Sequence, residues 1–179
     1  QNLKINDKLW SIGSPSNYKE TKNFMLGWLA GYTAGDGGWS GGIKDKYRKR
    51  RWQTITKEIN ERLNNYLEKC NFDYKKHKLL LKTGRMSYWT QSKLYKNVLV
   101  KNNKEWKRGF VSGFFDAEGS NMSHSITFSS INKKLLKQVQ SYIKLFNFKK
   151  MKIRYNNSSY YTDKNGKVKI NYTLLIYLN

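Results

Sequence analysis

The chain has a single cysteine, few acidic residues and no long apolar segment. Cys70 stands alone among 179 residues, which excludes an internal disulfide framework and any metal site built from several cysteines. No apolar run approaches the roughly 18 residues of a membrane-spanning helix, and neither a signal-peptide pattern nor a basic amphipathic helix with a broad apolar face is present. We therefore expect an intracellular protein with no membrane partner.

The shortage of acid is the most informative of these absences. Only 12 residues are acidic against 35 that are basic, so the formal net charge is +23. Such a surface repels itself unless it meets a polyanion, and nucleic acid is the first candidate. An apolar fraction of 38% still suffices for a packed core, in one ordinary domain or two small ones that share it. Abundant Lys, Asn, Tyr and Ile suggest an AT-rich genome, as in an organelle, a phage or its bacterial host.

One glycine-rich segment occurs twice. Residues 27–38 read GWLAGYTAGDGG, and residues 109–120, 82 positions later (109 minus 27), read GFVSGFFDAEGS. Glycines coincide at 27/109, 31/113 and 37/119, and a carboxylate coincides at Asp36 and Glu118. Residues between the glycines are small or apolar on nearly every side, which is typical of a buried helix. We expect Gly31 and Gly113 to let these helices approach a neighbour closely.

Each copy ends in an acidic residue followed by glycine. The pattern places Asp36 and Glu118 at the C-terminal ends of their helices, each before a glycine suited to a left-handed cap. A carboxylate is disfavoured there, because that end of a helix already carries partial negative charge. Acids placed twice at such an end predict a bound cation, and a metal ion is the simplest choice.

The remaining pattern predicts an α+β protein made of two units of order α-β-β-α-β-β. In the first unit we expect helices at 22–35 (with Thr21 as N-cap), 57–70 and 92–99, two strands joined by a loop within 41–47, and a hairpin over 78–90. In the second we expect helices at 105–117 and 132–146 and strands at 125–129, 150–154 and 168–178. A tight turn at Asn165-Gly166 joins the last two strands.

A second alignment of the two halves, at an offset of 76 (142 minus 66), supports the duplication. In it, Tyr66 with Asn71-Phe72 recurs as Tyr142 with Asn147-Phe148. The chain then divides into an N-terminal arm at 1–20, a first repeat at 21–100, a connection at 101–104 and a second repeat at 105–179. The second repeat is expected to lack the helix that closes the first.

The repeated segment resembles the motif of the LAGLIDADG homing endonucleases. Residues 29–37 match that motif at Leu, Ala, Gly, the final acid and the last Gly, and residues 111–119 match at Gly, both acids, Ala and Gly, with Glu as the final acid. The resemblance implies a monomer whose motif helices pack at a pseudo-two-fold axis. It also implies that two antiparallel sheets form a saddle on double-stranded DNA, and that the protein cuts both strands of one long site.

By resemblance, Asp36 and Glu118 are the catalytic pair and the only side-chain metal ligands. Mg2+ suits such a site, because it is a hard ion that binds carboxylate and phosphate oxygens and activates water. We expect Mn2+ to substitute, and Ca2+ to support binding without cleavage. The earlier acid of the second motif, Asp116, aligns with Ala34 and is expected either to have a structural role or to support the metal ligands from behind.

The family often carries a lysine near the start of the helix that follows the second strand of each half, but Ile131 occupies that position here. Lys57 and Lys133 align with each other at the offset of 76 (133 minus 57) and are the candidates for a catalytic lysine. They fit equally well as ordinary lysines at the start of a helix.

Basic residues alternate with aromatic ones after the first motif, and they recur on the later strands. In the implied fold, Arg and Lys on these strands meet phosphates and guanine edges, although alternation sends only half of them to one face. The candidate DNA-binding residues are Lys44, Lys46, Arg48, Lys49, Arg50, Arg51, Gln53, Lys78, Lys82, Arg85, Lys152, Arg154, Lys164, Lys167 and Lys169.

Two other functions stay open. An intron RNA maturase of the same fold would be equally basic, and so would a catalytically silent DNA-binding protein. Two acids favour the nuclease, because RNA binding needs neither. Cys70 falls on the apolar stripe of helix 57–70, so we expect it in the core, and His77 has no partner at metal-ligand spacing.

Overall fold

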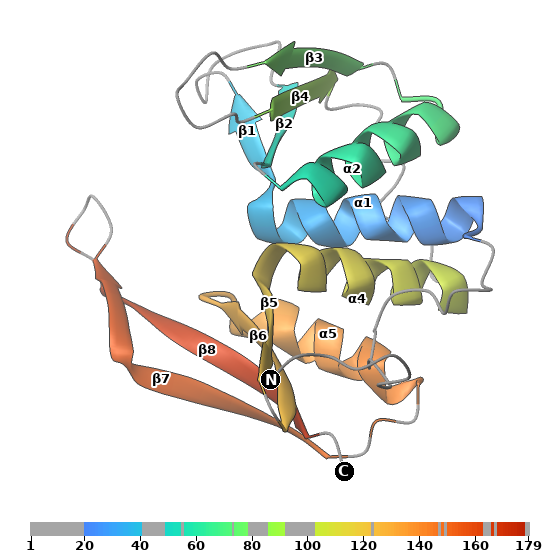
Figure 1. The fold of residues 1–179 in the computed structure, drawn as a ribbon. Coiled ribbons are helices and arrows are strands. Elements are labelled where there is room, and N and C mark those ends of the chain that lie inside the picture. The colour runs from blue at the N-terminus through green and yellow to red at the C-terminus, as the bar shows by residue number, and fades with distance from the viewer. Residues whose placement is uncertain are drawn as a thin grey trace, which may run out of the picture.

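Two parallel helices, α1 (Lys22–Asp36) and α4 (Lys104–Glu118), pack side by side at the centre of the protein (Figure 1). Each begins where the sequence offers a cap. The Thr21 hydroxyl accepts a hydrogen bond from the Phe24 amide at 3.1 Å, and the Asn103 side chain accepts one from the Trp106 amide at 2.7 Å. Both helices lie within one residue of their predicted bounds, and the predicted N-cap of α1 is confirmed.

This computed structural model describes residues 20–40, 49–54, 56–72, 74–78, 86–91, 103–122, 124–146, 148, 150–162, 166 and 168–177. Predictions for the arm before Glu20, the loop at 41–47, the turn near 83–84 and the helix at 92–99 lie outside these residues. Within the described ranges, no helix is long and apolar enough to span a membrane.

The two central helices touch through glycines, as predicted. A Cβ built on Gly31 would overlap the carbonyl oxygen of Phe110, and one built on Gly113 would overlap that of Trp28. Because 28 and 110 are themselves equivalent positions (110 minus 82), the two contacts are related by the pseudo-two-fold axis. Gly27 and Gly109 repeat the arrangement one turn earlier.

Each central helix carries its own sheet and covering helix. The first repeat continues with β1 (Gly38–Ser40), β2 (Lys49–Thr54), α2 (Lys57–Lys69), β3 (Tyr74–Lys78) and β4 (Met86–Gln91). The second continues with β5 (Gly119–Met122), β6 (Ser125–Ser130), α5 (Lys133–Lys144), β7 (Met151–Thr162) and β8 (Val168–Tyr177). The sheets have equivalent antiparallel orders, β1-β2-β4-β3 and β5-β6-β8-β7, which confirms the predicted pair of repeats.

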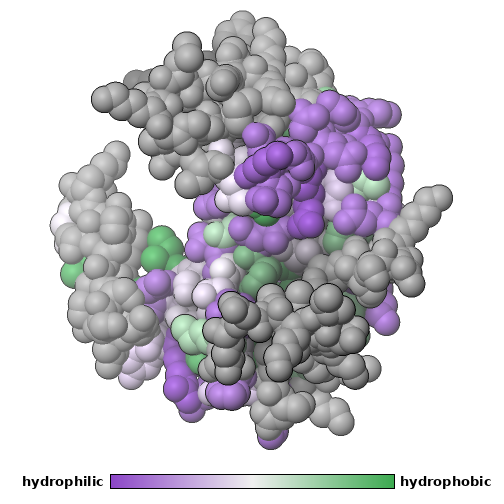
Figure 2. Space-filling view, viewed as in Figure 1, coloured by the Kyte–Doolittle hydropathy of each residue, from purple (hydrophilic) through white to green (hydrophobic). Residues whose placement is uncertain are grey.

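The core forms between each sheet and its helices. In β2 the even positions Trp52 and Thr54 are buried, and in β6 Ile126 and Phe128 are buried. Apolar residues at helical spacing bury one side of each covering helix, namely Leu63, Tyr66 and Leu67 of α2 and Leu136, Val139 and Ile143 of α5. Cys70, at the end of α2, is buried with them, as expected. The opposite side of α2 is hydrophilic (Figure 2).

Several local predictions were wrong. The glycines after the two acids are not left-handed, since φ is −74° at Gly37 and −87° at Gly119. Glycine is needed there because a Cβ would collide with Thr33 or Phe115 one turn back. The sequence pattern also gave no sign of β5, placed β3 too late, extended α5 by a residue or two at each end and stopped β7 at residue 154. The predicted turn is supported by Gly166, whose φ is +75°.

Candidate active site

Asp36 and Glu118 are the last residues of α1 and α4, so the parallel packing brings both carboxylates to one end of the central pair. The two sheets diverge from that end (Figure 1). Glu118 lies directly against the neighbouring helix, since a Cβ built on Gly35 would stand 2.8 Å from its Cγ. The sequence therefore places two acids beside each other where the electrostatic field of two helix ends disfavours them.

The pKa values of both acids reflect this placement. Partial burial raises the pKa of Asp36, and a hydrogen bond from the Tyr32 hydroxyl offsets part of that rise. Burial also raises the pKa of Glu118, and the nearby negative charge of Asp36 raises it further. Among the described residues, no ion pair involves either carboxylate.

A divalent cation fits this donor set. Two carboxylates with raised pKa values lack a positive partner in the described part of the chain, and both sit at helix C-termini. The described residues contain no group of three or more His, Cys, Asp or Glu that could hold a metal ion. A metal ion held here would have Asp36 and Glu118 as side-chain ligands, with the remaining positions left for water and phosphate oxygens, as Mg2+ prefers.

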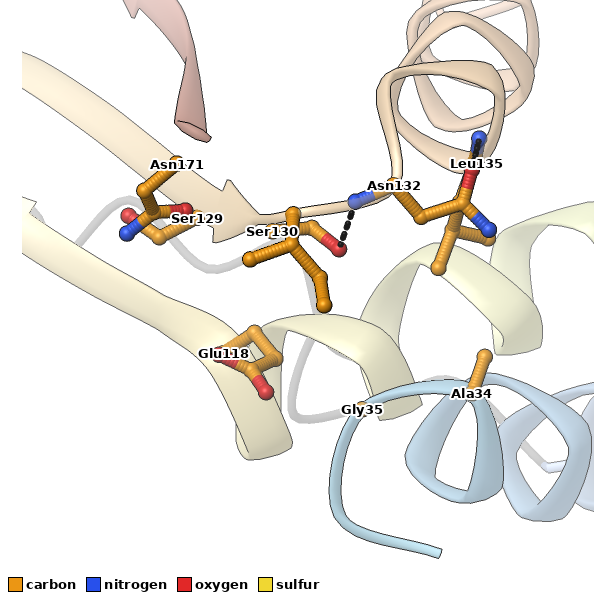
Figure 3. Close-up of a pocket in the computed structure, with 9 residues that line it drawn as sticks. Ala34, Gly35, Glu118, Ser129, Ser130, Asn132, Leu135 and Asn171 are labelled. Carbon is orange, nitrogen blue, oxygen red and sulfur yellow. Dashed lines mark hydrogen bonds between the residues drawn. The ribbon is translucent and has the colours of Figure 1, made fainter. Parts of the chain in front are cut away.

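A cavity of about 430 Å3 opens beside Glu118 (Figure 3). Polar groups from the end of β6 and the start of α5 line it, and hydrogen bonds partly fix them. The backbone NH of Asn132 donates to the Ser130 hydroxyl at 3.1 Å, and the backbone NH of Leu135 donates to the Asn132 side-chain oxygen at 3.1 Å. Its lining consists of Ala34, Gly35, Glu118, Ser129, Ser130, Ile131, Asn132, Leu135 and Asn171, without a cationic side chain among these described residues.

The two candidate catalytic lysines stand at equivalent places in the two repeats, but their side chains contact residues other than Asp36 and Glu118. Lys57 and Lys133 are the first residues of α2 and α5. The Lys57 Nζ lies 4.0 Å from Glu61, on a largely exposed helix face, and the Lys133 Nζ lies 5.3 Å from the centre of the Tyr172 ring. Neither contributes to the pKa of Asp36 or Glu118, so the structure does not bring the lysines onto the acids.

Most candidate DNA-binding residues lie on strands or outside the described ranges. Lys152 and Arg154 are exposed on β7, while Met151 and Ile153 pack against the core, so these two cationic side chains face outward. On the first sheet, β2 contains Lys49, Arg50, Arg51 and Gln53 along with the buried Trp52 and Thr54. Lys78 ends β3 and Lys169 is in β8. Residues outside the described ranges are Lys44, Lys46, Arg48, Lys82, Arg85, Lys164 and Lys167.

The polar contacts behind Asp36 were not predicted from the sequence. Tyr32, four residues earlier on α1, donates to the Asp36 carboxylate. Asp116 accepts hydrogen bonds from Trp28 Nε1 and Arg62 Nη1, both at 2.7 Å, and so ties α4 to α1 and α2. The spacing of four residues between Tyr32 and Asp36 was the available signal, because such pairs share one face of a helix.

Comparisons with known proteins agree with this architecture. Residues 105–177 match the family model described as a LAGLIDADG-like domain. A sequence search against curated proteins gives no match. Among solved structures, the chain is similar to mesophilic variants of the homing endonuclease I-DmoI, with 19% identity and a TM-score of 0.60 over 88% of this chain and 90% of that one.

Two further structures show the same fold. I-DmoI in complex with DNA and Mn is 21% identical, with a TM-score of 0.57 over 87% of this chain and 90% of that one. The N-terminal LAGLIDADG domain of DUF199/WhiA is 12% identical, with a TM-score of 0.62 over 88% of this chain and 76% of that one. Identities this low establish the fold alone. The predicted fold class and family resemblance are confirmed. None of these comparisons supports the RNA partner that the maturase alternative requires.

Proposed function

We infer that this protein, whose residues 105–177 form a LAGLIDADG-like domain within a chain of LAGLIDADG fold, is a DNA endonuclease that needs a divalent metal ion. The observation that supports this proposal most directly is the pair of acids at the adjacent C-terminal ends of α1 and α4. Two neighbouring carboxylates that lack a described cationic partner destabilise each other, and a structural role for them is not evident. The two acids lower the stability of the fold, and this loss is explained if their function is to bind a cation that DNA helps to hold.

In this proposal Asp36 and Glu118 would each hold one Mg2+ ion. When bound, Mg2+ lowers the pKa of a water ligand and offsets the charge that develops on the phosphate. Gly35 contributes by leaving space for the Glu118 side chain across the helix pair. With one acid from each repeat, each half serves one strand, and together they make a double-strand break.

The outer faces of the two sheets hold the DNA. On the second sheet, Lys152 and Arg154 project from β7, and the Arg154 guanidinium donates to the Tyr177 hydroxyl at 3.3 Å. On the first sheet, β2 contains Arg51 and Gln53. Cations on both sides of the central acids would contact phosphates, while some reach base edges and select a long site. The net charge of +23 supplies the attraction.

A catalytically silent DNA-binding protein is the second candidate. It is favoured by the cavity beside Glu118, where Ile131 contributes an apolar side chain and the described lining offers no cation. Such a protein would retain the saddle and its affinity for DNA. It would differ from the nuclease only in the response to a catalytic metal.

A selection from a DNA library separates the two candidates. The full chain is incubated with randomised or host-genomic fragments in Mg2+, and in parallel in Ca2+. The nuclease predicts discrete double-strand breaks at one long site in Mg2+, and retention of the same site without breaks in Ca2+. Site-specific retention in both ions with no break would establish the silent protein, and no selectivity for DNA would refute both.

A further inference from the structure

The two acids have different surroundings although their backbones repeat. Behind Glu118, on α4 and β6, lie three phenylalanines. The rings of Phe114 and Phe128 are stacked with centroids 5.8 Å apart, and Phe115 meets Phe128 edge-on at 5.7 Å. These rings have no hydrogen-bonding group to offer. In the described part of the chain, no side chain donates a hydrogen bond to Glu118, which borders the open cavity of about 430 Å3.

The equivalent positions behind Asp36 carry hydrogen-bonding groups. Tyr32 replaces Phe114 and Thr33 replaces Phe115 (both offset by 82), and Trp52 replaces Phe128 (offset by 76). The Trp52 Nε1 donates to the Thr33 hydroxyl at 2.7 Å, and that hydroxyl donates to the carbonyl of the preceding turn. Hydrogen-bonding side chains thus lie behind one acid, and apolar rings lie behind the other.

Of these side chains, Tyr32 is the one that reaches Asp36. Its hydroxyl is hydrogen-bonded both to the Asp36 carboxylate and to the side chain of Thr54, at the end of β2. Tyr32 is only 2% exposed, so this hydroxyl works in surroundings that exclude water. A tyrosine hydroxyl is protonated at neutral pH, so it can donate to the carboxylate.

The Tyr32 ring is itself held in place. It stacks on Trp28 with centroids 5.0 Å apart and an angle of 5° between the planes. Trp28 is fixed in turn, because its indole NH donates to Asp116, which also pairs with Arg62. Residues from α1, α2 and α4 therefore determine where the Tyr32 hydroxyl stands. A carboxylate that receives a hydrogen bond from so constrained a donor has a restricted orientation.

We propose that Tyr32 is a positioning residue that orients the Asp36 carboxylate for a divalent cation, and that none of the described residues does the same for Glu118. This inference rests on the proposed function, since it assumes that Asp36 is a metal ligand. It makes the two halves unequal: Asp36 is orientated before the metal ion arrives, whereas Glu118 must be ordered by the ion and the DNA. Removal of the Tyr32 hydroxyl should then weaken one metal site and leave the other unchanged.

The test measures Mn2+ binding by electron paramagnetic resonance in the wild-type chain and in Tyr32→Phe. Each protein is measured alone and with a DNA duplex that the wild type retains in Ca2+. Phenylalanine occupies the equivalent position 114, so the replacement suits this type of helix packing. Loss of such a supporting hydrogen bond should lower the Mn2+ affinity of one site by about 10–100-fold. The affected site is identified as the one that Asp36→Asn removes.

Two further variants keep the test decisive. Tyr66→Phe is the matched control, because Tyr66 is also buried and meets the same Trp28 ring edge-on at 5.2 Å, but it stands on α2. It should leave Mn2+ affinity unchanged. Thr54→Val removes the second partner of the Tyr32 hydroxyl, together with the hydrogen bonds between the Thr54 hydroxyl and the Thr56 backbone. It should produce a smaller loss at the same site, even if Tyr32→Phe folds poorly.

The outcomes separate this inference from the proposed function. A selective loss at the Asp36 site in Tyr32→Phe supports the positioning role, whether or not the wild type cuts DNA. Equal Mn2+ affinity in wild type and Tyr32→Phe, or an equal loss in Tyr66→Phe, overturns it. Mn2+ binding without cutting by the wild type refutes the proposed nuclease alone, and a wild type that binds no Mn2+ refutes both.

Discussion

Replacement of Gly31 by alanine tests the central helix packing. The added Cβ would overlap the Phe110 carbonyl oxygen and lie 2.8 Å from both the Phe110 carbonyl carbon and the Phe114 amide nitrogen. All three atoms belong to the backbone of a buried helix, so no side chain can move aside. Overpacking of this kind costs about 1–3 kcal/mol, and this site falls at the upper end because α1 and α4 would have to separate.

The higher helix propensity of alanine recovers about 1 kcal/mol of that cost. The net loss in the free energy of unfolding is therefore about 2 kcal/mol, which lowers Tm by roughly 4–8 °C in a chain of this size. Thermal and urea unfolding would measure it. Gly113→Ala, the equivalent change, should give a similar loss, since its Cβ meets the Trp28 carbonyl in the same way.

Gly35→Ala is the comparator, because it lies in the last turn of α1 and its nearest neighbours are side-chain atoms of Ala117 and Glu118. We expect it to cost less stability than Gly31→Ala. An unchanged or higher Tm for Gly31→Ala would mean that propensity alone decides the outcome, and it would refute the close packing of α1 on α4.

Two further predictions concern charge. Affinity for DNA should fall by about 10³–10⁵ between 50 and 200 mM salt if roughly six to ten phosphates are contacted, as a filter-binding titration would show; a flat response would contradict groove binding. Glu118→Gln should raise the free energy of unfolding at pH 7 without metal or DNA, because the raised pKa of Glu118 means that its ionised form destabilises the fold. That gain should fade as the pH falls through the raised pKa toward the ordinary value of 4.5, where the wild-type acid is also neutral; a gain that persists at low pH would need another cause.

The sequence predicted the architecture well because the duplication supplies two independent copies of one pattern. Small residues at a spacing of four mark α1 and α4, and the glycines at 31 and 113 correctly indicated close contact between helices. The amphipathic periods of α2 and α5 were equally clear. These features depend on local spacing, which a sequence displays directly.

What the sequence did not predict depends on partners distant in the chain. The strand β5 reads Gly-Ser-Asn-Met, which has no strand pattern, and it forms by pairing with β6. The second half of β7 contains Asn156 and Ser158, which are poor strand formers, yet pairing with β8 continues to Thr162 past an irregularity. The support of Asp36 by Tyr32 also depends on Trp28 and Asp116, whose contact crosses between the two repeats.

Cleavage of the selected DNA site by wild type and by acid variants tests the central claim most directly. Asp36→Asn and Glu118→Gln keep the size of each side chain but remove its charge, and Glu61→Gln, on the exposed face of α2, is the matched control. With Mg2+, the wild type and Glu61→Gln should make double-strand breaks, while Asp36→Asn and Glu118→Gln retain the DNA without a double-strand break. Full cutting by Asp36→Asn or Glu118→Gln would contradict the assignment of these two carboxylates as the metal site.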